Sequence, residues 1–239
     1  MAGTLRASAR AQAARPRSRR PTGPPLGVLA AISLGLALAG LAAALAAGRA
    51  FASPFAPTGQ PLDYDRHGVA LRLSATLLFG SAVPLGIFAA TAYTRLLRLG
   101  AQVPGPSIGF FGGVAASLML MLSATTGWVL GHPGVGSDAA VSRALSLLGY
   151  VTGGVGFAVG LGLLVAGVAV PALVLRLAPR WVAWTGLAVA AVSEVSFLAM
   201  ALPGLQVLLP VGRYAGLAWL VGIGCLLPHG RPTAHERQP

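Results

Sequence analysis

Charged side chains are scarce in this chain. Only 9% of the 239 residues are charged, whereas an ordinary soluble domain has roughly 25%. Hydrophobic residues make up 55%, and the mean hydropathy is +0.76. No water-soluble fold can bury that much apolar surface, so the solvent must be a lipid bilayer. The composition therefore excludes a cytosolic enzyme, a secreted disulfide scaffold and a disordered chain.

Lysine and asparagine are absent, and only five residues are acidic. All 17 basic residues are arginine, which gives a net charge of +12. The dominant residues, Ala, Gly, Leu, Val, Arg and Pro, are typical of a high-GC bacterial genome. A single cysteine, Cys225, excludes an internal disulfide and any CxxC redox or zinc site.

Long apolar runs are what the chain has in abundance. The predicted fold class is all-α, a polytopic transmembrane helix bundle of about six helices. Runs of about 18 residues or more can cross roughly 30 Å of hydrocarbon as helices, and they are continuous rather than alternating, which excludes a β-barrel. The expected spans are 26–48, 69–92, 107–130, 145–175, 181–202 and 211–228.

The fourth run is about 31 residues, too long for one straight crossing. We expect it to start in the membrane interface, to tilt, or to bend at Pro171.

The arginines predict an orientation with both termini cytoplasmic, because cytoplasmic segments carry the excess of positive charge. With the N-terminus inside, the inner side holds twelve arginines and the outer side four. Residues 1–25 are predicted to form a disordered, Arg-rich cytoplasmic tail that contacts anionic lipids, and residues 229–239 a second cytoplasmic tail. Together these patterns indicate a multi-pass protein of the bacterial plasma membrane.

The first run also resembles a signal peptide, since a basic flank precedes it and a small-residue stretch follows at 50–52. Its apolar length of about 23 residues exceeds the usual 7–15, which favours an uncleaved helix.

Small residues are spaced for close helix contact in the fourth run. Gly156 and Gly160 form a GxxxG pair, and Gly162 belongs to a neighbouring row of small residues. These glycines predict helix packing within the chain; the alternative is a homodimer face.

Aromatic residues next to a basic residue predict an anchor at the membrane interface. Trp181 and Trp184 follow Arg180, at the start of the fifth run. The stretch from Leu175 to Gly186 resembles the Leu-Pro-Arg-Trp-Leu-Gly-Trp-Leu-Gly linker of uncharacterised six-helix integral membrane proteins of actinobacteria. Ala178, Val182, Ala183 and Thr185 depart from that pattern. The resemblance implies the six-helix architecture and no particular activity.

Glu194 is the most informative residue, because it lies in the middle third of the fifth run. An acid at that depth costs roughly 2.5–3.5 kcal/mol or more and is expected to face the interior with a partner. Arg72, inside the second run, is the candidate partner. The two residues predict a structural ion pair, or a neutral hydrogen-bonded acid, or a proton or substrate site.

Carboxylates and imidazoles gather in the predicted outer segments, and together such groups can bind a divalent metal. Their spacing matches no strong ligand motif, so a solvated loop is the competing interpretation. The residues are Asp63, Asp65, His67, His132 and Asp138.

Three functions remain open. The chain has no Walker, GxSxG or HExxH motif, which favours a non-enzymatic partner, scaffold or accessory subunit with no cofactor. Its partners would be the bilayer, a second copy or another membrane protein, and not nucleic acid. The alternatives are a small transporter or channel that uses Glu194, and a membrane-embedded enzyme acting on a lipid or quinone.

Overall fold

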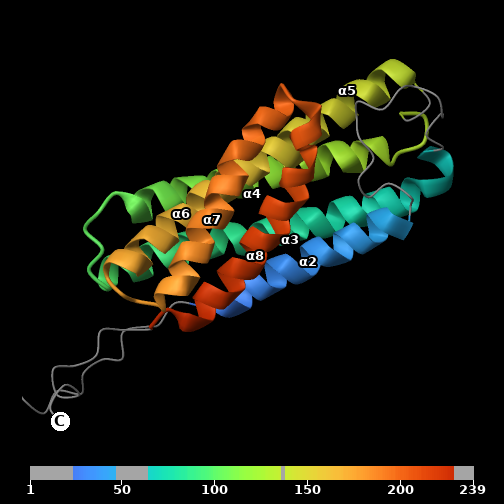
Figure 1. Ribbon diagram of the computed structural model, residues 1–239. Helices are drawn as coiled ribbons and strands as arrows, with labels where there is room; N and C mark the ends of the chain where they lie inside the picture. Colours follow the sequence, from blue (N-terminus) through green and yellow to red (C-terminus); the bar gives the residue numbers. More distant parts are fainter. Residues whose placement is uncertain (1–23, 47–63, 136–137, 229–239) are drawn as a thin grey trace, which may run out of the picture.

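The computed structural model describes residues 24–46, 64–135 and 138–228, which form an elongated bundle of helices (Figure 1). Six helical stretches in these ranges are long and apolar enough to cross a membrane. The first three are α2 (Leu26–Ala46), α3 (Tyr64–Arg98) and α4 (Gly105–Leu130). The fourth joins α5 (Ala139–Tyr150), η1 (Val151–Gly156) and α6 (Phe157–Val174). The last two are α7 (Arg180–Val195) with η2 (Ser196–Met200), and η3 (Pro203–Val207) with α8 (Leu208–Leu226). The all-α bundle predicted from the apolar runs is confirmed.

The second helix is longer than its apolar run. α3 begins at Tyr64 and continues through Arg95 and Arg98, which occupy its last turn. Two residues after the helix, Gly100 has a φ of 92° and closes the turn. The amide of Gly100 donates to the Leu97 carbonyl, and the amide of Ala101 donates to the Leu96 carbonyl. Polar residues at both ends thus extend the helix beyond the span that hydropathy detects.

Helix α2 packs between α3 and α8. Ser33 and Ser81 each donate their hydroxyl to the other's carbonyl, at 2.9 and 2.8 Å, and Ser74 donates to the Gly40 carbonyl. Gly27 lies against Gly224 of α8, so the start of α2 and the end of α8 share one end of the bundle. The first run is therefore an integral part of the bundle in the structure, while residues 50–52 lie outside the described residues.

Helices α4 and α6 approach at backbone distance through glycines. A Cβ atom on Gly160 would lie 2.7 Å from the Ala116 amide nitrogen, and one on Gly112 would lie 2.7 Å from the Gly160 carbonyl oxygen. Gly156 faces Met119 of α4, and Gly162 faces α7. The glycines predicted to pack helices lie in contacts within one chain, and α4 and α7 cover the face that the homodimer alternative requires.

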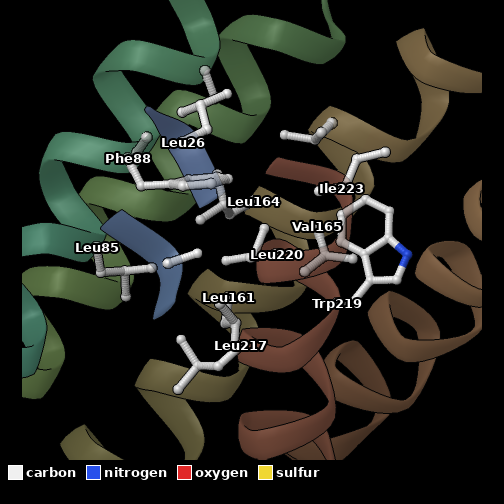
Figure 2. Close-up of a cluster of buried hydrophobic side chains, with 14 of the residues drawn as sticks. Leu26, Leu85, Phe88, Leu161, Leu164, Val165, Leu217, Trp219, Leu220 and Ile223 are labelled. Atoms are coloured by element: carbon white, nitrogen blue, oxygen red, sulfur yellow. The ribbon is translucent and has the colours of Figure 1, made fainter. Parts of the chain in front are cut away.

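The centre of the bundle is filled by apolar side chains from α2, α3, α6 and α8. Figure 2 shows Leu26, Phe88, Leu164 and Leu220 converging there, with Trp219 at one side. These side chains are buried from both lipid and water. They hold the helices that position the polar groups described below.

The irregularity in the fourth span lies at η1, a π-helical turn over Val151–Gly156. Pro171 is only three residues from the end of α6, where the helix is already terminating. A bend at Pro171 stays a prediction, as do a tilt and a start in the membrane interface. The wider turn occurs where Gly153, Gly154 and Gly156 reduce side-chain crowding.

Candidate functional site

Glu194 lies in the last turn of α7 and is directed towards α6. A Cβ atom on Gly162 would lie 2.8 Å from its Oε1, so the missing side chain of Gly162 is what makes room for the carboxyl group. Oε1 is buried and has no hydrogen-bond partner. Buried polar atoms in native proteins nearly always have one, so this oxygen requires an explanation.

Ser193 adds a second polar atom without a partner. The residue is fully buried between α7 and α8, where a Cβ atom on Gly212 would lie 2.7 Å from its Oγ. Oγ has no hydrogen-bond partner. The Ser193 carbonyl accepts a hydrogen bond from the Ser196 hydroxyl, at the point where α7 gives way to η2.

Arg213 of α8 lies at the same level of the bundle as Glu194. The residue that precedes Arg213 is Gly212, and it contacts Ser193, the residue that precedes Glu194. Its guanidinium donates from Nη2 to the Gly153 carbonyl and lies 4.5 Å from the centre of the Phe157 ring. Along α6, Phe157 and Gly162 are about 7 Å apart. The guanidinium and the carboxyl group therefore contact different turns of the same span, at a similar level of the bundle. We call Ser193, Glu194 and Arg213 the polar seam.

The described elements that pack against α7 are α6, α8 and η2. Among their residues, Arg213 is the only one that carries a charge opposite to that of a glutamate. The titratable residues of α8 are Arg213, Tyr214 and Cys225, and α6 and η2 have none. Within α7 itself the other titratable residue is Arg180, at the opposite end of the helix. Arg213 is thus the cationic residue closest in level to Glu194, since Arg180 lies about 20 Å away along α7.

The predicted ion pair between Arg72 and Glu194 is wrong. Arg72 donates from Nη1 to the Gly131 carbonyl at the end of α4, at 2.8 Å. Helices α3 and α7 make no contact in the described part of the chain. Arg72 and Glu194 cannot pair because α4 and α6 lie between α3 and α7.

The structure forms no metal-binding group from those predicted outer-loop ligands that it describes. Asp63 and the side chain of Asp65 lie outside the described residues. Asp138 caps α5, where it accepts hydrogen bonds from the amides of Ala140 and Val141. The His132 ring packs on Trp128, with 4.1 Å between ring centres. No group of three or more His, Cys, Asp or Glu residues exists among the described residues, where His67 also lies.

The tryptophans divide into two kinds. Trp181 and Trp184 are exposed by 70% and 62%, as interface anchors beside Arg180 would be. Trp219, which sequence reasoning missed, fills the notch left by Gly186 and donates its indole N–H to the Val182 carbonyl at 2.8 Å. It fixes α8 against α7, the two helices that carry the polar seam.

No known protein family, curated protein or solved structure matches the chain.

Proposed function

We propose that this protein is a small proton-coupled transporter or channel of the bacterial plasma membrane, in which Glu194 binds and releases the proton. One observation carries the proposal: Oε1 of Glu194 is buried between α6 and α7 without a hydrogen-bond partner. The high-GC composition and the excess of arginine in the predicted inner segments support the bacterial membrane and the cytoplasmic termini.

An acid that served only the fold would be expected to have a donor. A buried carboxyl group without one costs stability, whether it is neutral or charged. Ionisable residues inside membrane spans are typical of proton relays and substrate pathways. Ser193 Oγ offers a further polar atom at the same level, which a transferred ion or water could use.

Arg213 supplies the positive charge that stabilises Glu194 once it has lost its proton. When Glu194 loses its proton, the carboxylate has one cationic residue at its level, and that residue is already held within the bundle. The Gly153 carbonyl and the Phe157 ring hold the guanidinium while Glu194 is neutral. Proton release then requires the guanidinium and the carboxylate to approach each other.

Flux measurement tests this proposal. The purified protein is placed in liposomes that contain a pH-sensitive dye, and a pH gradient is imposed with the membrane potential clamped. We expect wild-type protein to dissipate the gradient faster than protein-free liposomes, and Glu194→Gln to reduce that rate at least tenfold, a loss typical of removing a proton-transfer group.

Glu236→Gln provides the matched control, because it is the same substitution in the C-terminal tail. Equal flux in wild type and Glu194→Gln would refute the proposal. A rate no greater than that of protein-free liposomes would refute it too, and would favour the role of partner or accessory subunit. That role predicts instead that another membrane protein is recovered with this chain from native membranes.

A further inference from the structure

Arg95 is a buried arginine with no acidic partner among the residues that the structure describes. It lies in the last turn of α3, with only 8% of its surface exposed, and its Nη1 has no hydrogen-bond partner. Phe88, Ala92 and Leu99 lie on the same face of α3 and are buried as well. The guanidinium therefore faces into the bundle and not into the surrounding solvent.

The helix register shows how far Arg95 lies from the middle of the bundle. Ser117 donates to the Ala82 carbonyl, and the rings of Tyr93 and Phe110 are 5.5 Å apart. Because α3 and α4 are antiparallel, these pairs place Arg95 level with the first turn of α4, near Ser107.

At that level α2 and α8 do not cover α3. The pairing of Ser33 with Ser81 puts the start of α2, Leu26, level with Phe88. The end of α8 is level with the start of α2, since Gly224 touches Gly27. Arg95 is seven positions beyond Phe88, about 10 Å further along α3. Helix α3 thus extends past its neighbour α2 where Arg95 is buried, and α8, which packs on α2, also ends before this level.

Positive charge surrounds this position. Gly105 at the start of α4 faces Pro171 near the end of α6, so the connections 99–104 and 175–179 are neighbours. Around them lie three exposed arginines, Arg98, Arg176 and Arg180. Of the acidic side chains that the structure describes, Asp138 begins α5 at the other end of the bundle, and Glu194 is about 20 Å along α7 from Arg180.

Membrane orientation explains the exposed arginines but does not explain Arg95. Exposed arginines at a cytoplasmic end set topology and need no ligand. An unpaired buried guanidinium carries a desolvation cost that a topology signal would avoid by staying exposed. Its planar set of donors fits phosphate oxygens, and basic pockets between membrane helices bind phospholipid headgroups.

We propose that Arg95 binds a phosphate group, and that at this depth its source is the headgroup of an anionic phospholipid. The exposed arginines attract the headgroup, and its phosphate inserts at the end of the bundle that α2 leaves uncovered, where it accepts a hydrogen bond from Nη1 of Arg95. This site is separate from the polar seam and does not depend on the function proposed for Glu194.

Thermal unfolding in lipid nanodiscs tests the site. Wild-type protein is compared in discs of phosphatidylcholine alone and in discs with phosphatidylglycerol added. Bound ligand stabilises the folded protein, so we expect phosphatidylglycerol to raise the wild-type Tm by roughly 5 °C. We expect Arg95→Leu to abolish this rise. Arg98→Gln is the matched control, and it should keep most of the rise because its side chain is exposed at the same end.

The direction in which Arg95→Leu changes the Tm distinguishes a binding role of Arg95 from a structural one. In phosphatidylcholine alone the variant should be at least as stable as wild type, because it removes an unpaired buried charge. Arg95→Lys keeps the charge without the planar donors and should recover only part of the rise. It also provides a second variant if Arg95→Leu does not fold.

Three outcomes decide the source of the anion. A rise with phosphatidylglycerol but not with inorganic phosphate supports the lipid headgroup. An equal rise with inorganic phosphate in phosphatidylcholine discs keeps the phosphate site but overturns the lipid source. The site itself is refuted if wild type and Arg95→Leu respond equally to both anions.

Discussion

Two arginines inside apolar helices, Arg72 and Arg213, are each bound by a backbone carbonyl and not by an acidic side chain. Arg72 donates to the free carbonyl of Gly131 at the end of α4, and Arg213 donates to Gly153 in the π-helical turn. Both bind backbone oxygens where a regular helical hydrogen bond is missing. The acid at Glu194 is left with an unpaired oxygen, although its own span and the neighbouring α8 each carry an arginine.

The stability effects of Arg72→Leu and Glu194→Leu are expected to be additive. Their helices do not touch, so each substitution acts on its own surroundings. A double-mutant cycle of unfolding in detergent should give a coupling energy below about 0.5 kcal/mol, as for other distant sites. Recovery of stability in the double variant, compared with either single one, would show that the two residues do meet.

The failure of the predicted ion pair has a physical cause. Sequence predicts depth in the membrane well, because residue number and helical rise give it directly. It does not predict which helices are neighbours, and it gives no signal for an arginine that binds a backbone carbonyl, since every residue has one. Glu194 was found because an acid in an apolar run is conspicuous. Arg213 was counted among the four outer arginines, because it lies three positions after Pro210, at the start of the sixth apolar run.

At the scale of the helices, the π-helical turn and Arg213 form one unit. The glycines of η1 allow the wider turn, and Arg213 satisfies the Gly153 carbonyl inside it. The sequence cue, Thr152 followed by three glycines in four residues, was visible but also fits a plain helix-packing motif. The turn depends on a contact 60 residues away, which local sequence does not reveal.

Arg213→Leu should therefore loosen η1 selectively. Without the guanidinium, the Gly153 carbonyl loses a charge-assisted hydrogen bond worth about 1.5–3 kcal/mol. Amide hydrogen exchange in residues 151–157 should accelerate at least tenfold, while exchange in α2 stays unchanged. Arg143→Gln, an exposed arginine on α5, is the control and should leave both regions as they are. Equal acceleration throughout the molecule would indicate global destabilisation instead.

For the whole molecule, the six apolar runs determine the architecture, and their continuity is why the helices were predictable to within a few residues at most ends. The start of α2 and the end of α8 lie at one end of the bundle, which agrees with an even number of crossings. Which end faces the cytoplasm is a matter of charge distribution and not of helix contacts.

Reporter fusions test that orientation. Fusions after residues 100 and 178 should give cytoplasmic signals, and fusions after 58 and 137 external ones, because the arginine excess lies with the first pair. A cytoplasmic signal at 58 would reverse the assignment, and Arg95 would then lie at the external leaflet.

The glycine contacts between α4 and α6 divide the molecule into a fixed part and an adjustable part. Sliding α6 by one residue would bring a side chain to the place where Gly160 now lies against the Ala116 amide, so these two helices are locked in register. Between α7 and α8 the contacts at the level of Glu194 are made by side chains and one glycine, with serine and arginine groups that can change partners. Any alternation of access at Glu194 would therefore take place by exchange of hydrogen-bond partners among the side chains of the polar seam, while α4 and α6 stay in register.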